Sequence, residues 1–317
     1  MELASPRPCR NGGHRGFSAA WCAPWAALVC GGMTLPSRTL STCVAAALMA
    51  AACSRASQTD TEPLPGEARR GGLTVSLPDP LGDVTVTEAR VPGRPLVVID
   101  PGHGGRDPGA PGIASGVREK QLTLLVAREL RDRLARSGRV RLALTRDRDR
   151  SLQLDQRSDI ARRLGADLFV SLHADSSSDA SARGATVYSL SEIASDTDAA
   201  RMAAMQGNGT ARNTSGGSVR ALLADLAARD AMNASAEFAL RLVGTAAGEI
   251  SLRPEPHRFA AFRVLRRAEA PAVLFEMGYL SNAQDEAMLL DPRQREQIVA
   301  MMARAIETEM ALKAVSR

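Results

Sequence analysis

The sequence predicts a single three-layer α/β domain, built around a mostly parallel β-sheet, over residues 95–317. Short runs that are apolar throughout, such as LVVID at 96–100 and DLFVSLH at 167–173, are typical of strands buried on both faces. The segments between such runs repeat apolar residues at helical spacing. Strands that alternate with helices along a chain favour a sheet with helices on both faces.

The expected elements follow in chain order. The strand at 96–100 leads through a glycine-rich turn to a helix that begins at Glu119 and ends at Ser137–Gly138. A second helix carries Ile160 and Leu164, and a last helix follows Pro292. The remaining strands are expected at 139–146, 167–173, 184–190, 262–267 (FRVLRR) and 271–278.

The charge pattern argues against a nucleic-acid partner. The 317 residues carry a net charge of +5, but Lys120 and Lys313 are the only lysines. The arginines are interspersed with acids, as in TRDRDR at 145–150, whereas a nucleic-acid surface usually shows a stripe of one sign with aromatic residues. A solvated surface of mixed charge is therefore expected, with no nucleic acid bound.

The N-terminal residues 1–53 resemble an export signal rather than part of the fold. From Met33 to Cys53 the chain has one positive charge at Arg38, then an apolar stretch, then small residues. The ending LMAAAC resembles a bacterial lipobox, although Ala50 stands where Leu is usual. We therefore expect a lipoprotein signal with an acylated Cys53, with a soluble periplasmic protein cut nearby as the alternative.

Two further boundaries follow from this N-terminal region. Residues 1–32 lack the order of a signal, so either Met1 or Met33 can be the initiator. Residues 54–94 are rich in Pro, Gly, Ser and Thr without a helical period, and are expected to be a tether. All five cysteines lie within residues 1–53, so the globular part has neither a disulfide nor a thiolate metal site.

Four ionisable residues are expected to meet at one edge of the sheet. His103 follows the first strand, His173 and Glu276 end two others, and Glu119 begins the helix after the first turn. The crevice at the carboxyl ends of strands is where open α/β sheets bind ligands. Two imidazoles and a carboxylate form the ligand set of a catalytic zinc, with the fourth position left to water.

Each of these residues also has a structural alternative. A histidine in a glycine turn often serves as a hydrogen-bonding residue, and Glu119 could be a first-turn acid favoured by the helix dipole. His173 could be a buried histidine with satisfied hydrogen bonds, and Glu276 could pair with an arginine. His257 is expected to lie in a polar loop that contains prolines and to be structural or substrate-facing, while His14 lies in the excluded N-terminal region.

Four motifs together identify a family. The chain contains no G-x-S-x-G elbow, H-E-x-x-H helix or phosphate-binding Walker loop. The motifs VVIDPGHGGRDPGA, GVREKQLTL, ADLFVSLHAD and PAVLFEMGYLSN resemble those of the zinc-dependent N-acetylmuramoyl-L-alanine amidases of bacterial cell-wall turnover (amidase type 3). The resemblance covers residues 95–313 and implies a phosphorylase/hydrolase-like fold.

The resemblance also implies a reaction. The family cleaves the amide between N-acetylmuramic acid and the L-alanine of the peptidoglycan stem peptide. Matched motif by motif, its Zn²⁺ ligands correspond to His103, Glu119 and His173, and its catalytic glutamate to Glu276. A zinc peptidase of related fold that acts on cell-wall peptides, or an inactive wall-binding module, remain the alternatives.

Residues 191–256 resemble the insert of the regulated amidases of cell division. In those enzymes a helix covers the zinc until an activator protein displaces it, and an acidic side chain of the helix can occupy the open metal position. Gln206 stands where that acid would align, and a neutral amide is a weaker zinc ligand than a carboxylate. We therefore expect leaky steric inhibition relieved by a partner, with a helical hairpin packed on the surface as the alternative.

Overall fold

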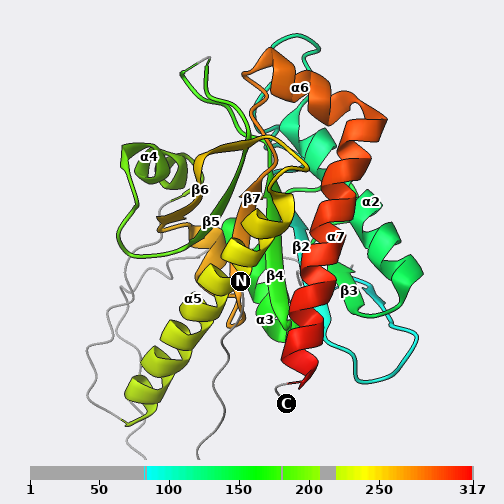
Figure 1. Cartoon of the computed structure of the whole chain (residues 1–317). Helices are drawn as coiled ribbons and strands as arrows, with labels where there is room; N and C mark the ends of the chain where they lie inside the picture. Colours follow the sequence, from blue (N-terminus) through cyan, green and yellow to red (C-terminus); the bar gives the residue numbers. More distant parts are fainter. Residues whose placement is uncertain (1–81, 83, 180, 208–218, 316–317) are drawn as a thin grey trace, which may run out of the picture. The chain divides into compact units, whose positions relative to one another are not determined.

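A seven-stranded sheet forms the centre of the described domain (Figure 1). The structure is a computed structural model that describes residues 82, 84–179, 181–207 and 219–315. The strand order is β1-β3-β2-β4-β7-β5-β6. The strands are β1 (Val86–Thr87), β2 (Leu96–Pro101), β3 (Arg141–Leu144), β4 (Leu168–His173), β5 (Ala185–Leu190), β6 (Leu252–Ala260) and β7 (Ala272–Glu276).

The strand directions bring several carboxyl ends to one edge of the sheet. Strands β3, β2, β4 and β7 are parallel neighbours, β1 is antiparallel to β3, and β5 is antiparallel to β7. Strand β6 is parallel to β5. The expected three-layer α/β fold with a mostly parallel sheet is confirmed.

Helices cover both faces of this sheet. The first apolar layer contains buried side chains of α2 (Glu119–Ser137), α5 (Val219–Ala246), α6 (Ala283–Leu290) and α7 (Pro292–Val315). The second contains those of α3 (Leu154–Leu164), α4 (Thr197–Met205) and the short 3₁₀ helix η2 (Arg263–Leu265). Because each face of the sheet is covered, its central strands are apolar on both sides.

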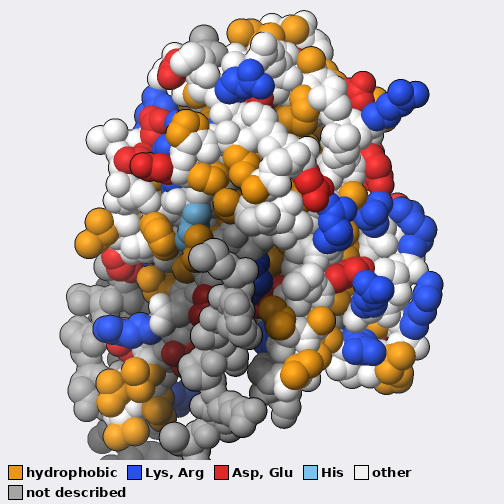
Figure 2. Space-filling view, viewed as in Figure 1, with side chains coloured by type: hydrophobic (Ala, Val, Ile, Leu, Met, Phe, Trp, Pro, Cys, Tyr) orange, Lys and Arg blue, Asp and Glu red, His pale blue; other side chains and the backbone are white. Residues whose placement is uncertain are grey.

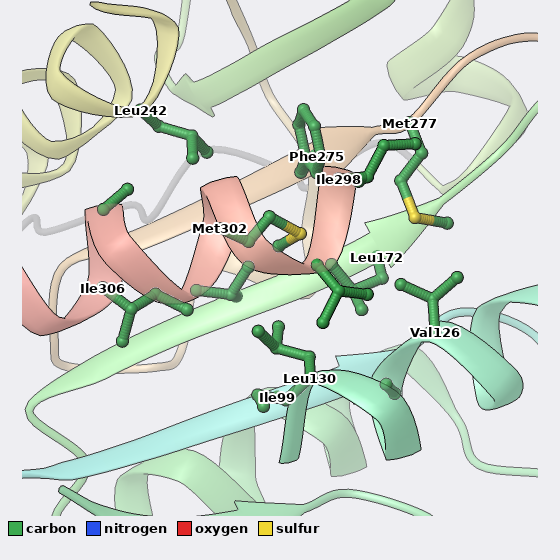
Figure 3. Close-up of a cluster of buried hydrophobic side chains, with 14 of the residues drawn as sticks. Ile99, Val126, Leu130, Leu172, Leu242, Phe275, Met277, Ile298, Met302 and Ile306 are labelled. Carbon is green, nitrogen blue, oxygen red and sulfur yellow. The ribbon is translucent and has the colours of Figure 1, made fainter. Parts of the chain in front are cut away.

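The larger apolar layer holds α2 and α7 against the central strands (Figure 3). Ile298 and Met302 of α7 lie near Leu172 of β4 and Phe275 of β7, and all four side chains are fully buried. Truncating a buried Leu or Met to Ala typically costs about 2–5 kcal/mol of stability. This packing therefore fixes β4 and β7, the two strands that end in His173 and Glu276.

Several local expectations differ from the structure. FRVLRR, expected as a strand, contains η2 instead, and the segment around His257, expected as a loop, lies in edge strand β6. The sequence of β6 does not predict a strand, because it contains two prolines and several charged residues and has no apolar alternation. An edge strand tolerates such residues. Within the expected tether, Val86–Thr87 forms β1 and pairs with β3.

The insert also differs from what its sequence predicts. The apolar spacing in ALLADLAARD and SAEFALRLVG predicts separate helices, whereas the structure has one continuous helix, α5, whose C-terminal half contributes Phe238 and Leu242 to the core. Helix α6 was not expected from the sequence. The signal region 1–53, with Cys53 and His14, lies outside the described residues.

Candidate metal centre

The carboxyl ends of three adjacent strands position the predicted site. Strand β2 ends two residues before His103, β4 ends at His173, and β7 ends at Glu276. His173 and Glu276 are register partners across β4 and β7. Glu119 is the first residue of α2, whose C-terminus is set by Gly138 in the left-handed conformation (φ 65°). Three of the four residues thus belong to elements packed in the core, and His103 lies in the turn that follows β2.

His103, Glu119 and His173 form a compact cluster. Their potential ligand atoms all lie within 4.8 Å of one another. Glu119 lies between the two rings, with Oε2 at 3.0 Å from His103 Nε2 and Oε1 at 3.0 Å from His173 Nδ1. The two imidazoles meet edge to face, with ring centroids 4.9 Å apart.

Glu119 is held as a buried carboxylate. The backbone N–H groups of Ala110 and Ala174 donate to its two oxygens at 2.9 and 3.0 Å. Burial alone would raise the pKa of Glu119, but its contacts with His103 and His173 outweigh burial and hold this pKa well below the ordinary value. The charged form, which is the form that binds a metal, is therefore favoured.

A tight turn orients the His103 ring. His103 has φ of 59°, a left-handed conformation that costs a non-glycine residue about 1–3 kcal/mol. Backbone hydrogen bonds between Gly104 and Asp107 close the turn, and Asp107 Oδ2 lies 2.8 Å from His103 Nδ1. Burial alone would lower the pKa of His103, but Asp107 and Glu119 raise it to about 10.

Two glycines allow the cluster to close. A Cβ atom on Gly102 would lie 2.4 Å from the His173 ring, and one on Gly109 would lie 2.6 Å from Glu119 Oε2. Contacts this short do not occur between real side chains, so any larger residue would displace a member of the cluster. These two glycines of the first motif are thus explained by close approach of the backbone to the site.

The cluster has the chemistry of a zinc site. His103 Nε2 is buried and, despite its distance to Glu119, has no partner in hydrogen-bonding geometry among the described residues. An unpaired buried nitrogen is costly, and a metal ion would satisfy it. Two imidazoles and one carboxylate leave a fourth position open, as catalytic zinc sites do. These residues therefore fit the ion.

Glu276 lies beside the cluster but outside it. The carboxylate is fully buried, and Oε2 accepts the Asp175 N–H at 3.1 Å. Burial, together with the negative charges of Asp175 and Glu119, raises the pKa of Glu276 well above the ordinary value. A buried carboxyl with a raised pKa accepts protons near neutral pH more readily than an exposed one.

Gln206, at the end of α4, reaches Glu276. Its Nε2 donates to Glu276 Oε1 at 3.1 Å and lies 3.4 Å from Asp175 Oδ2. Its own Oε1 is buried without a hydrogen-bond partner in the described part of the chain. The sequence placed Gln206 at the metal position, whereas its hydrogen bonds in the structure go to Glu276 and Asp175.

The site opens into a cleft of about 710 Å³. His103 and His173 line it on one side, and the end of α4, from Met205 to Gly207, lines it on another. The cleft is therefore bounded by the two predicted histidine ligands and by the segment expected to regulate them.

His257 does not join this cluster. Its Nε2 lies 2.8 Å from Ser189 Oγ, and its ring lies against Phe259. Sequence reasoning assigned no role to Asp107 or Asp175, although both contact site residues. The motif contained a signal for Asp107, because histidines that bind metals commonly place the second ring nitrogen against a carboxylate.

Residues 97–308 match the family model described as N-acetylmuramoyl-L-alanine amidase. The chain belongs to this family. The matched range contains the positions of all four predicted site residues. Among solved structures, the fold is similar to that of the N-acetylmuramoyl-L-alanine amidase from Clostridium difficile 630. That similarity has a TM-score of 0.51 at 21% identity, over 68% of this chain and 96% of the other.

Two curated members of the amidase family illustrate the degree of similarity. The chain is 32% identical over 217 residues to the probable amidase AmiB of Haemophilus influenzae, and 31% identical over 220 residues to the amidase AmiA of Escherichia coli. The alignments cover 65% and 68% of this chain. They cover 50% of AmiB and 75% of AmiA, so the chain spans about half the length of the first relative.

Proposed function

We propose that this protein is a zinc-dependent amidase that cleaves the bond between N-acetylmuramic acid and the L-alanine of the peptidoglycan stem peptide. The observation that carries the proposal is the cluster of His103, Glu119 and His173 beside the buried Glu276, in a chain of the amidase family. A wall-binding module without activity would have no need of a buried carboxyl with a raised pKa next to three ligands.

The residues divide the reaction between them. A zinc ion held by His103, Glu119 and His173 would supply a Lewis acid that activates water and polarises the amide carbonyl. Glu276 takes the proton from the attacking water and transfers it to the leaving alanine nitrogen. The Asp175 N–H holds Glu276 Oε2, which leaves Oε1 as the oxygen for proton transfer.

Product analysis tests the substrate. Purified muropeptides incubated with the protein are expected to yield sugar and an intact stem peptide that begins with L-alanine, as identified by mass spectrometry. Cleavage within the peptide would support a zinc peptidase instead, and unchanged muropeptides would support the inactive wall-binding module.

Helix α4 acts as a lid over the catalytic glutamate in this proposal. The side-chain amide of Gln206 donates a hydrogen bond to Glu276 Oε1, the oxygen that proton transfer requires. Two ion pairs tie α4 to strand β6: Asp196 with Arg258 and Asp198 with Arg253, both at 3.2 Å. Substrate therefore reaches the base only when α4 moves away.

Weakening these ion pairs is expected to raise activity. The double substitution Asp196→Asn and Asp198→Asn keeps an N-cap on α4 but removes both charges. Two partly exposed pairs contribute about 1 kcal/mol together, which corresponds to roughly a fivefold larger open fraction. Hydrolysis of purified peptidoglycan should rise accordingly.

The control for the lid is Asp225→Asn, which removes an exposed ion pair with Arg229 on α5. It should leave activity unchanged. The ion-pair variant is preferable to deleting residues 196–217, because α4 buries Ala199, Met202 and Ala203 in the core. A folded double variant no more active than the parent would contradict the lid.

An activator protein is proposed to open the lid by binding the insert. Leu222, Leu223 and Leu226 on the N-terminal half of α5 are about half exposed or more, at 60%, 60% and 49%. Apolar side chains lie exposed over this end of α5 at the lower left of Figure 2. A cluster of exposed leucines is typical of an interaction surface. A periplasmic extract that contains the partner should then stimulate the parent more than the double variant.

We propose a periplasmic location with a lipid anchor on the outer membrane. Among the described residues, no helix combines the length and apolarity needed to cross a bilayer. If Cys53 is acylated, two or more chains would anchor the protein stably, whereas a single chain would not. Ser54 follows Cys53 in place of the Asp that favours inner-membrane retention in enteric bacteria.

The Cys53→Ala variant is expected to move from the membrane pellet to the soluble fraction. The measurement is fractionation after a high-salt wash, with mass spectrometry of the parent's N-terminal peptide to detect the acyl chains. Cys43→Ala, in the same segment, serves as the control and should leave the distribution unchanged. A Cys53→Ala protein that still pellets with membranes would argue for another mode of attachment.

A further inference from the structure

Two buried arginines form hydrogen bonds to the turn that contains His103. Arg146 follows β3 and Arg157 lies on α3, and the two are 1% and 3% exposed. Neither is a predicted metal ligand, and neither takes part in the proton transfer described above. Both guanidinium groups are directed at the backbone of the same three consecutive residues, Pro101, Gly102 and His103.

Every carbonyl of this tripeptide accepts a hydrogen bond from these guanidinium groups. The Pro101 oxygen accepts from Arg146 Nε at 3.0 Å and Arg157 Nη1 at 2.7 Å. The Gly102 oxygen accepts from Arg146 Nη2 at 2.6 Å, and the His103 oxygen from Arg157 Nη2 at 2.6 Å. Hydrogen bonds from a charged donor are roughly twice as strong as neutral ones.

The charge of Arg157 is compensated from within the sheet. Asp100, the residue before the tripeptide, is fully buried and accepts from Arg157 Nη1 at 2.9 Å. The fork of Arg157 thus joins the Asp100 side chain to the carbonyls of Pro101 and His103. A lysine has one ammonium group without this planar fork and could not serve all three acceptors with the same geometry.

We propose that Arg157, with Arg146, is a positioning residue that holds the His103 turn in its left-handed conformation and so presets the geometry of the metal centre. His103 carries φ of 59°, which a non-glycine residue keeps only when its surroundings enforce it. Without the hydrogen bonds from Arg146 and Arg157, the turn relaxes and His103 Nε2 moves away from Glu119 and His173. Metal binding must then first restore the turn. This inference rests on the proposed metal centre.

The experiment compares zinc affinity with stability in Arg157→Lys. Dissociation constants are measured by competition with a chromogenic chelator, and stability by thermal unfolding of the zinc-free full-length protein. The matched control is Arg295→Lys: Arg295 is buried, pairs with Glu129 and binds the consecutive carbonyls of Leu289 and Leu290, away from the site. Both variants are expected to unfold at lower temperature.

Only Arg157→Lys is expected to weaken zinc binding, by about 10- to 100-fold, as typical for loss of an outer partner of a metal ligand. Arg295→Lys should bind zinc as the parent does. If Arg157→Lys does not fold, the double substitution Asp100→Asn with Arg157→Gln removes both charges of this ion pair together and is measured instead. Zinc affinity equal to the parent's in a folded Arg157 variant would contradict the positioning role of Arg157. Absence of zinc binding by the parent itself would overturn the proposed metal centre instead.

Discussion

Replacing His103 or His173 by Ala is expected to remove the bound zinc and abolish hydrolysis together. Each imidazole faces one oxygen of Glu119 at 3.0 Å, so either loss leaves only two ligands for an ion that binds through three protein residues at catalytic sites. The loss of zinc affinity should exceed the ~100-fold that removal of an outer partner costs. Zinc content per chain after dialysis, measured by elemental mass spectrometry, gives the result.

His257→Ala provides the matched control for this experiment. His257, on edge strand β6, binds Ser189 of β5 and lies outside the cluster, so its substitution should leave zinc content unchanged. Retention of one zinc per chain by both His103→Ala and His173→Ala would place the metal elsewhere in the protein.

Replacing Glu276 by Gln is expected to lower kcat by at least ~10²-fold while zinc stays bound. The amide has the size of the carboxyl and can still accept the Asp175 N–H, but it cannot take a proton from water. Zinc content and kcat are measured on the same preparation. Glu119→Gln should show the opposite pattern, with weakened zinc binding as the primary defect.

Glu309→Gln controls for the loss of a buried glutamate. Glu309 on α7 is 8% exposed and pairs with Arg241, so its substitution is expected to affect stability rather than turnover. If Glu276→Gln retains the parent's kcat, the general base is another group.

The parts of the fold that depend on apolar periodicity were predictable. Strands β2 and β4 and helix α2 bury whole faces in the core, and the α2 boundaries at Glu119 and Ser137 match those expected. Strand β6 was missed because an edge strand needs no apolar face, and its backbone pairing with β5 depends on a neighbour distant in sequence. The predictions failed where tertiary contacts, rather than local pattern, decide the structure.

The candidate site shows the same division. The positions of His103, His173 and Glu276 at strand ends were predictable from the apolar runs that precede them, and the structure brings the two histidines together with Glu119. The roles of Arg146 and Arg157 were not predictable, because 40 lysines and arginines give no sign of which are buried. Whether an arginine is buried with its guanidinium group against backbone carbonyls depends on the fold and cannot be read from the local sequence.

Titration of the zinc-free protein tests the central claim most directly. Zinc is added in steps while release of the stem peptide from purified muropeptides is measured, with bound zinc determined in parallel. We expect no release without metal and a rise to a plateau at about one zinc per chain, the stoichiometry of a mononuclear site. Full release of stem peptide by the metal-free protein would contradict the account.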